Sequence, residues 1–368
     1  MSNLPFNSPT ELQPKSLSPN SSYICIKSPD LLVDPCLITQ GKSQFLLCSR
    51  IPCTNPENPI DLSLYTINHS TMPKFSTCFF PIKDTYTRIF SSQTHNGYFG
   101  GYQTKNQITY LTLFKITGQG FKKLVSLKLN SVGMKLSTNA LHFLKNPYEC
   151  LFIPGDGSLK YLDFKKKAVI SETASNNYEG FKYHSRYKIL AVKRKEELQL
   201  MKLIPQKEIV SMNKTITGHE IFQDGLSRPT VAFFLTQYSD LKDYIFDEEN
   251  NLLYTVFAWV SWTRKSASLS LPPSITHLRF QKWNVNEGNV ELVDQRDIEW
   301  NHSRNQIFNL HVKGKQCLVS EPNGIYIISL EDYRLKEKIL GKRYLGISKD
   351  NNVILQETNR NFFGVDFF

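Results

Sequence analysis

The strongest constraint on the fold is a hairpin pattern that recurs along the chain. In the clearest example, alternating segments at 150–154 and 158–164 flank Asp156-Gly157. Runs of β-branched and aromatic residues between turn residues indicate strands, and Asp-Gly predicts a two-residue turn in which both residues have positive φ. The same arrangement flanks three further tips, Lys195-Glu196, Asn323-Gly324 and Asn359-Arg360. Long amphipathic helical patterns are scarce, so the sequence predicts an all-β protein.

The spacing of the hairpins indicates how they combine. Neighbouring tips lie about 40 residues apart, which is the length of one four-stranded propeller blade. Comparable sets of strands are expected within residues 36–82, 87–129 and 240–298. We therefore predict a single closed β-propeller of about seven four-stranded blades.

The two ends of the sequence fit a closed ring. Residues 22–27 form a lone predicted strand, and the last unit reaches Phe368 one strand short. If the N-terminal strand completes the last blade, two exposed sheet edges disappear. The predicted propeller domain covers residues 22–368 and follows a flexible tail at residues 1–21. Within the domain, residues 215–237 form an irregular segment and residues 263–274 form a loop insertion.

The end of the third strand carries a further pattern. At this position the sequence reads Leu162-Asp163, Leu330-Glu331, Trp283-Asn284 and Val365-Asp366. WD40-type β-propellers close this strand with Trp-Asp. The chain resembles that family over most of residues 22–368, with degenerate repeats, and the resemblance implies the propeller fold.

Targeting signals are scarce in the sequence. The N-terminus lacks the basic start and apolar segment of a secretory signal. The strongest apolar run, at 255–260, is far shorter than the roughly 20 residues that a membrane-spanning helix needs. The seven cysteines are odd in number and form no Cys-x-x-Cys pair, which does not fit a disulfide framework. We therefore expect a nuclear or cytoplasmic protein with reduced thiols and no membrane span.

The sequence lacks known catalytic signatures. Its eight histidines are scattered without a His-Glu-x-x-His motif, and there is no Gly-x-Ser-x-Gly elbow or glycine-rich phosphate loop. We predict no enzymatic activity, no metal and no cofactor. The alternative is a pair of carboxylates that converge on the central channel, since general acids and bases need only proximity in space.

The chain is basic, with 44 Lys and Arg against 33 Asp and Glu, a net charge of +11. The two densest clusters are the predicted anion-binding residues, namely Lys165, Lys166 and Lys167, and Lys193, Arg194 and Lys195. Such residues neutralise phosphates in nucleic-acid complexes. Alternatively, the charge protects sheet edges from association, and the interrupting Glu196 and Glu197 favour that interpretation.

All four tryptophans fall within the longest unit, at residues 240–300. Trp259 and Trp283 are expected in the core of that blade. Trp262, followed by Arg264 and Lys265, leads into the insertion and is the predicted partner contact, because Trp and Arg are enriched in interface hot spots.

Two functions remain as hypotheses. The first is a non-catalytic scaffold for protein–protein interaction, a WD40-like subunit whose partners are other protein subunits of a larger cytosolic or nuclear complex. The alternative is a propeller that binds nucleic acid or an anionic lipid headgroup through its basic surface. The second hypothesis predicts an affinity that falls steeply with salt.

Overall fold

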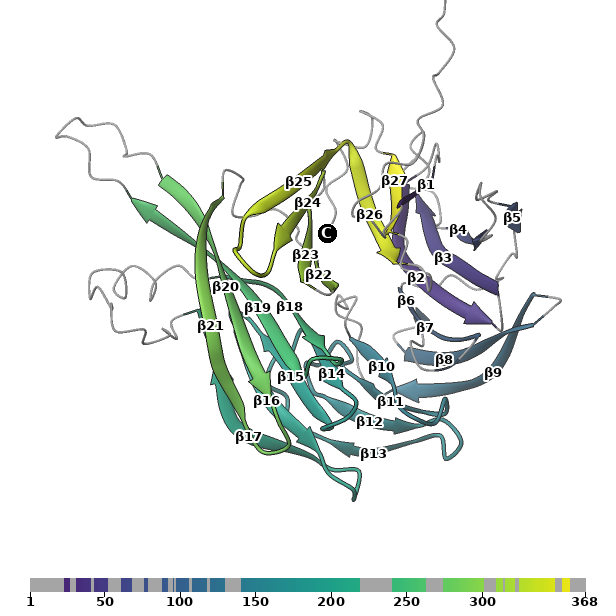
Figure 1. Cartoon of the computed structure of the whole chain (residues 1–368). Coiled ribbons are helices and arrows are strands. Elements are labelled where there is room, and N and C mark those ends of the chain that lie inside the picture. The colour runs from purple at the N-terminus through teal and green to yellow at the C-terminus, as the bar shows by residue number, and fades with distance from the viewer. Residues whose placement is uncertain are drawn as a thin grey trace, which may run out of the picture.

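The fold was analysed in a computed structural model (Figure 1). The structure describes residues 23–26, 31–40, 43–51, 61–67, 76–78, 88–91, 95, 97–105, 108–117, 120–129, 140–218, 240–262, 274–300, 309–313, 315–321, 324–347 and 353–357. All structural statements concern these residues. The predicted tail at 1–21 and the strand expected after Asn359-Arg360 lie outside them.

The described residues form strands and turns only, as predicted for an all-β protein. The first three sheets are β2 (Leu31–Gln40), β3 (Ser43–Ile51), β4 (Asp61–Ile67) and β5 (Ser76–Cys78); β6 (Arg88–Ser91), β7 (Tyr98–Lys105), β8 (Ile108–Thr117) and β9 (Gly120–Leu129); and β10 (Leu141–Phe143), β11 (Glu149–Phe152), β12 (Lys160–Asp163) and β13 (Ala168–Glu172). Each is antiparallel, with its strands in chain order.

The remaining strands form three similar sheets and one smaller sheet. They are β14 (Gly180–His184), β15 (Ile189–Arg194), β16 (Glu197–Leu203) and β17 (Ile209–Ile216); β18 (Asp240–Asp247), β19 (Leu252–Trp262), β20 (Ser274–Val285) and β21 (Val290–Trp300); β22 (Asn309–Lys313), β23 (Gln316–Glu321), β24 (Gly324–Ser329) and β25 (Leu335–Leu340); and β26 (Lys342–Ile347) and β27 (Val353–Glu357) with β1 (Tyr23–Ile26). The structure therefore contains six four-stranded sheets and one three-stranded sheet.

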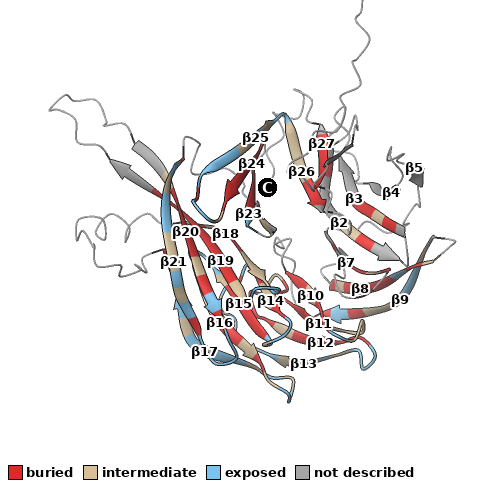
Figure 2. Cartoon of the chain, viewed as in Figure 1, coloured by how far each residue is buried: buried red, intermediate tan, exposed pale blue. Residues whose placement is uncertain are grey.

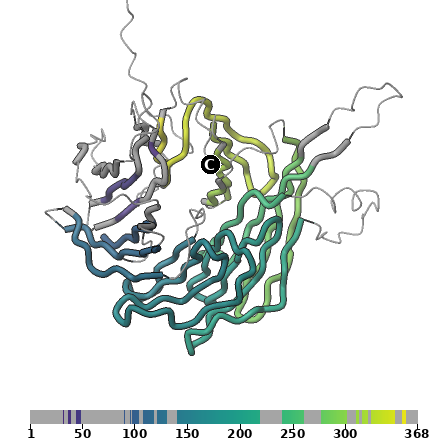
Figure 3. Tube along the Cα trace, turned by 180° about the vertical axis from the view of Figure 1, so that it is seen from behind, coloured from purple at the N-terminus to yellow at the C-terminus, as the bar shows by residue number. Residues whose placement is uncertain are grey.

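The sheets have a propeller-like arrangement around a common centre (Figures 1 and 3). The inner strand is the first strand in each of the first six sheets and β26 in the seventh (Figure 1). Neighbouring sheets meet through these inner strands, since β2 contacts β6, β10 contacts β14, and β18 contacts both β14 and β22. The seventh sheet lies between the sixth and the first, because β26 contacts both β24 and β2. The sequence pattern thus predicted the units well, including the spans at 36–82 and 87–129.

The N-terminal strand joins the last sheet, as expected from the sequence. β1 pairs with β27 in parallel, with Tyr23 opposite Val353 and Ile26 opposite Gln356. Every other strand pair in the described sheets is antiparallel, and β26 pairs with β27 in that way. The two ends of the described chain therefore share one sheet.

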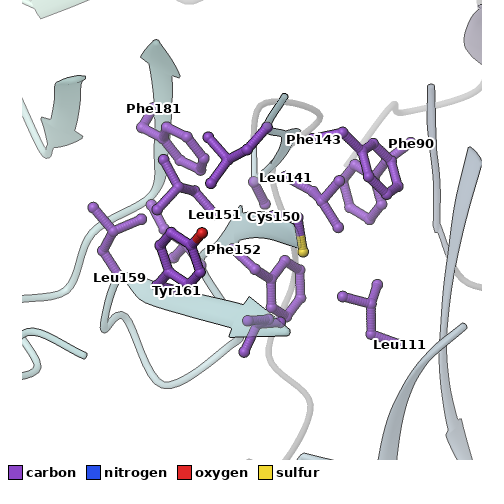
Figure 4. Close-up of a cluster of buried hydrophobic side chains, with 14 of the residues drawn as sticks. Phe90, Leu111, Leu141, Phe143, Cys150, Leu151, Phe152, Leu159, Tyr161 and Phe181 are labelled. Carbon is purple, nitrogen blue, oxygen red and sulfur yellow. The ribbon is translucent and has the colours of Figure 1, made fainter. Parts of the chain in front are cut away.

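The hydrophobic core lies between the sheets (Figure 2). The middle strands are largely buried, whereas the outer strands β13, β17 and β25 alternate between intermediate and exposed residues. The largest cluster joins the second, third and fourth sheets, and it includes Phe90, Phe143, Phe152 and Phe181 (Figure 4). The rings of Phe90 and Phe152 meet edge to face with centroids 6.3 Å apart. Each inner face is thus buried by its neighbour.

The Asp156-Gly157 turn differs from the predicted two-residue hairpin. β11 ends at Phe152 and β12 begins at Lys160, so a wider loop joins them. Only Gly157 has positive φ, at 70°, and a Cβ atom there would lie 2.7 Å from the Cα of Asn177. The Asp156 carboxylate accepts the Ser158 amide at 2.9 Å, which closes an Asx turn instead of a type I′ turn.

The acidic residue noted at the end of the third strand has a structural role in the third sheet. The buried Asp163 carboxylate accepts hydrogen bonds from the amides of Lys165 at 2.9 Å and Lys166 at 3.0 Å, which caps the β12–β13 turn.

Further sequence predictions concern the fifth sheet and the segments around it. Trp259 and Trp283 are buried, as expected. The segment predicted as irregular at 215–237 begins later than expected, because β17 continues to Ile216. Residues 219–237 and residues 263–273 of the insertion predicted at 263–274 lie outside the described residues, and Ser274 already belongs to β20.

Polar bridges link the inner strands of successive sheets. A β-bulge between Leu241 and Asp243 turns the Asp243 carboxylate inward. There it accepts hydrogen bonds from the ammonium group of Lys182 on β14, at 3.1 Å, and from the backbone amide of Leu310 on β22, at 2.6 Å. One buried carboxylate therefore joins the fourth, fifth and sixth sheets.

A second bridge joins the last sheet to the first. The Gln356 side chain accepts the amide of Leu32 at 3.3 Å, and Arg343 donates to the Leu32 carbonyl at 2.6 Å. Nearby, a Cβ atom on Gly346 would lie 2.6 Å from Leu37 of β2, so the two sheets approach where the side chain is absent.

We predict that Asp243→Asn destabilises the protein by about 2–4 kcal/mol, because it removes a charge partner of Lys182 and weakens a buried bridge. Urea unfolding would measure the change. Glu172→Gln removes an exposed carboxylate that pairs with Lys160 and should cost under about 1 kcal/mol. Equal losses in the two variants would contradict the bridging role.

A second prediction concerns pH. Burial lowers the pKa of His142 to about 4, and the negative charge of Glu248, which acts to raise this pKa, only partly opposes the effect. The unfolded chain binds a proton at His142 near pH 6.5 while the folded chain does not, so stability falls as the pH drops from about 7 to 4. His142 contributes at most about 3 kcal/mol to this loss. Urea unfolding of His142→Gln should show a flatter pH dependence than the wild type over this range, and an identical slope would contradict the assignment.

Candidate interaction surface

Side-chain contacts between sheets show which turns lie at the same end of the molecule. The His95 ring donates to the Leu144 carbonyl at 2.5 Å, so the β6–β7 and β10–β11 turns are neighbours. Lys207 of the β16–β17 turn pairs with Glu149 at the start of β11, at 3.1 Å. Because the strands of each sheet alternate in direction, its first and third turns lie at one end and its second turn lies at the other.

This alternation separates the two predicted anion-binding clusters. Residues Lys165–Lys167 form the third turn of their sheet, between β12 and β13, whereas Lys193–Lys195 flank the second turn of the next sheet, between β15 and β16. The clusters therefore lie at opposite ends of adjacent sheets, and the structure does not bring them together.

The two clusters also differ in their acidic neighbours. Lys193 pairs with Glu179 at 3.4 Å, and Arg194 pairs with Glu197 at 3.5 Å. At the other end, the three side chains of Lys165–Lys167 are exposed. The acidic interruption inferred from the sequence thus applies to one cluster, whereas the carboxylate beside the other is the buried Asp163, which caps the turn through backbone amides.

Further cations surround Lys165–Lys167. We define the basic turn surface as the described residues of the first and third turns of the second, third and fourth sheets, with the adjoining strand positions. Its basic residues are Lys115, Lys122, Lys145, Lys165, Lys166, Lys167, Arg186, Lys188 and Lys207, and its acidic residues are Glu149, Asp163 and Glu208. Positive charge therefore dominates this end of three successive sheets.

Two of these carboxylates are already engaged. Asp163 caps its own turn through backbone amides. Glu149 accepts hydrogen bonds from the Tyr161 hydroxyl and from Lys207. Burial alone would raise the pKa of Glu149, but these two donors hold it below the ordinary value. Both carboxylates are thus committed to structural contacts, and Lys207 is the one cation of this surface that Glu149 pairs with.

Tyrosines recur on the basic turn surface. Tyr98, Tyr148 and Tyr187 each stand at or just before the second strand of their sheet, and all three are partly exposed. A cation lies over each ring: Lys115 over Tyr98 at 5.2 Å, Lys165 over Tyr148 at 4.9 Å, and Arg186 over Tyr187 at 5.4 Å from the centroid. Such pairs contribute about 0.5–1 kcal/mol at exposed sites.

These tyrosines were not among the site residues predicted from the sequence. They occur as Asn-Gly-Tyr98, Asn-Pro-Tyr148 and Ser-Arg-Tyr187. Equivalent backbone hydrogen bonds reach Gly97, Tyr148 and Lys188, so the tyrosines lie at three successive positions of the unit and form no exact sequence repeat. Arg186 precedes Tyr187 directly in the chain, whereas the pairing of Tyr98 with Lys115 and of Tyr148 with Lys165 joins different turns and could not be read from the sequence.

The predicted partner contact lies on a different part of the molecule. Trp262 is the last residue of β19, and Arg264 and Lys265 lie outside the described residues. β19 and β20 have 11 and 12 residues, compared with 6 and 7 for β15 and β16 of the preceding sheet. The fifth sheet therefore extends beyond its neighbour at the end that carries Trp262 (Figure 1).

A polar network braces this extended part of the fifth sheet. The guanidinium of Arg279, only 2% exposed, pairs with Asp297 at 2.7 Å and donates to the Gly218 carbonyl at 2.9 Å. Trp259 stacks on His277 with centroids 4.2 Å apart, and its indole donates to Asp297 at 3.4 Å. The extension is thus fastened to the end of β17.

Among the described residues, no group of three or more His, Cys, Asp or Glu side chains is placed to hold a metal ion. A shallow groove beside β9 and β13 is lined by Lys128, Asp156, Lys160 and Glu172. Lys160 pairs there with Asp156 at 3.2 Å and Glu172 at 2.6 Å, so these charges satisfy one another. The described part of the chain also contains no helix of the length and hydrophobicity required to cross a membrane.

Comparisons with known proteins add only a distant likeness. No protein family matches the sequence, and no curated protein matches it. Among solved structures, a structural genomics target from Lactobacillus plantarum is similar, with 11% identity and a TM-score of 0.49 over 88% of this chain and 87% of that one.

A matched pair of variants tests the separation of the basic clusters. We predict that K165Q/K166Q/K167Q elutes from heparin at clearly lower salt than the wild type, because phosphate and sulfate contacts set the salt dependence. K193Q/R194Q/K195Q removes the same charge, and likewise includes one residue of positive φ, but should elute near the wild type. Equal shifts for both variants would show that only net charge matters.

Proposed function

We propose that the chain is a non-catalytic scaffold for protein–protein interaction, a closed seven-bladed propeller of the WD40 type. It would serve as a subunit of a larger cytosolic or nuclear complex. The observation that carries this proposal is the extension of the fifth sheet beyond its neighbour, fastened by the Arg279–Asp297 pair. A rigid projecting sheet is a pre-organised docking element, because little entropy is lost when a partner binds it.

The polar contacts of the inner strands support a non-catalytic role. The best-placed ionisable groups there, Lys182 and Asp243, are committed to a bridge between sheets. Such a bridge stabilises the frame and leaves neither group available to a substrate. Trp262, at the end of the projecting strand, remains our expected contact for the protein partner.

A second candidate function has an observation of its own. The basic turn surface concentrates exposed cations at one end of three successive sheets, with its carboxylates largely engaged. We therefore retain binding of an anionic ligand, nucleic acid or a lipid headgroup, through this surface. The projecting sheet and the basic turn surface belong to different parts of the molecule, so the two functions are compatible.

Isolation of the tagged, full-length protein from the cells that produce it tests the scaffold proposal. We expect a stoichiometric protein partner that is lost in Trp262→Ala. Val293→Ala is the matched control, since it truncates an exposed apolar side chain at the opposite end of the same sheet and should keep the partner. A wild-type protein that stays monomeric and recovers no stoichiometric partner would overturn the proposal.

A further inference from the structure

The basic turn surface has two features, and the anion-binding function proposed above uses only the first of them. Exposed cations lie at one end of three successive sheets, and a partly exposed tyrosine recurs in each of those sheets. We propose that this surface binds single-stranded nucleic acid, with the cations on the phosphates and with bases stacked on Tyr98, Tyr148 and Tyr187. The inference rests on the second candidate function and names its ligand.

The charge of the surface favours an extended polyanion. The basic residues come from five turns in three sheets, so no single small anion could contact them all. Interaction with a chain of phosphates releases counterions at each contact, and affinity grows with the number of contacts. The cation-rich turns follow one another around the molecule, which suits a ligand that passes from sheet to sheet.

The tyrosines favour a ligand with flat faces. The cation above each ring belongs to a flexible Lys or Arg side chain, and an exposed cation–π contact is weaker than the stacking of a base on an aromatic ring. A base can therefore displace Lys165 from Tyr148, while the freed ammonium group moves to a neighbouring phosphate. An acidic peptide would gain the charge contacts alone.

The distribution of apolar side chains argues against a lipid surface. Membrane association by a protein surface needs apolar side chains that enter the headgroup region. In the described residues, the large exposed apolar side chains are Val169, Val210, Val293, Leu335 and Leu340. All of them lie on the fourth strands of their sheets. Val169 and Val210 adjoin the third turns of the basic turn surface, which thus carries two exposed valines and no exposed leucine, isoleucine or phenylalanine among the described residues.

The repeat of the tyrosines favours single strands over duplexes. Bases inside a duplex are stacked on one another and present only their edges, so a duplex can contact the cations but not the rings. Each of the three sheets offers one tyrosine near the start of its second strand, and the backbone hydrogen bonds to Gly97, Tyr148 and Lys188 place these tyrosines at three successive positions of the unit. The bases of one unpaired strand can therefore stack on successive rings. Such stacking depends little on the base sequence, because every base has a flat face.

Fluorescence anisotropy with a labelled 20-nucleotide oligothymidylate tests the proposal on the full-length protein. We expect K165Q/K166Q/K167Q to weaken binding of both the oligonucleotide and heparin, with K193Q/R194Q/K195Q as the matched control. Tyr98→Leu, Tyr148→Leu and Tyr187→Leu should each weaken oligonucleotide binding about tenfold and leave heparin binding unchanged. Leucine keeps apolar volume, which matters because Tyr98 and Tyr148 also pack against the core. A duplex of equal length should bind more weakly than the single strand.

Photo-crosslinking supplies a readout that needs no variant. A bromouracil-substituted oligonucleotide bound to the wild-type protein should crosslink at Tyr98, Tyr148 or Tyr187, and crosslinks confined to other regions would overturn the proposal. Tyrosine variants with wild-type oligonucleotide affinity would also overturn it, while lysine-dependent heparin binding would leave the anion-binding candidate standing. Binding of phosphatidylserine vesicles without oligonucleotide binding would assign the surface to lipid. The absence of binding to every polyanion would remove both proposals.

Discussion

Each sheet of this protein has two faces, and burial of both faces is the constraint on which the rest of the structure depends. A sheet of four short strands cannot bury its apolar side chains alone, so it must be covered on both sides by neighbours. The apolar clusters accordingly span pairs or triples of sheets, as in the one that contains Phe90, Phe143 and Phe181. The seventh sheet meets this requirement for the first and the sixth through side chains of β26 and β27. β1 completes that sheet by pairing with β27.

Polar groups at the inner strands give these apolar contacts a fixed geometry. Asp243 links three sheets, and Arg343 with Gln356 clamps both backbone groups of Leu32. Hydrogen bonds are directional, whereas apolar contacts tolerate sliding, so the bridges set how one sheet sits against the next. The turns of the second, third and fourth sheets are joined by other contacts, namely the hydrogen bond from His95 to Leu144 and the ion pair of Lys207 with Glu149. The basic turn surface is therefore a consequence of how the sheets pack.

Much of the fold could be predicted from particular residues. The units at 87–129 and 140–172 carry alternating strands between turn residues, and they became the second and third sheets. The prediction of a two-residue turn at Asp156-Gly157 was wrong, because the Asp156 side chain closes an Asx turn and Asp156 does not adopt positive φ. Lys167, Lys195 and Tyr333 do adopt positive φ without being glycine, so turn chemistry was a poorer guide than strand periodicity.

The sequence by itself determined the all-β class, the repeated unit, the pairing of the first strand with the last sheet, and the burial of Trp259 and Trp283, because hydrophobic periodicity and repeat length are local properties of the chain. Only the tertiary structure decided that Lys165–Lys167 and Lys193–Lys195 lie at opposite ends of adjacent sheets, and that the first group shares its end with Tyr98, Tyr148 and Tyr187. The direction of each strand fixes the end at which a turn emerges, and the packing of neighbouring sheets fixes which turns meet. Residues far apart in the sequence become one surface for that reason.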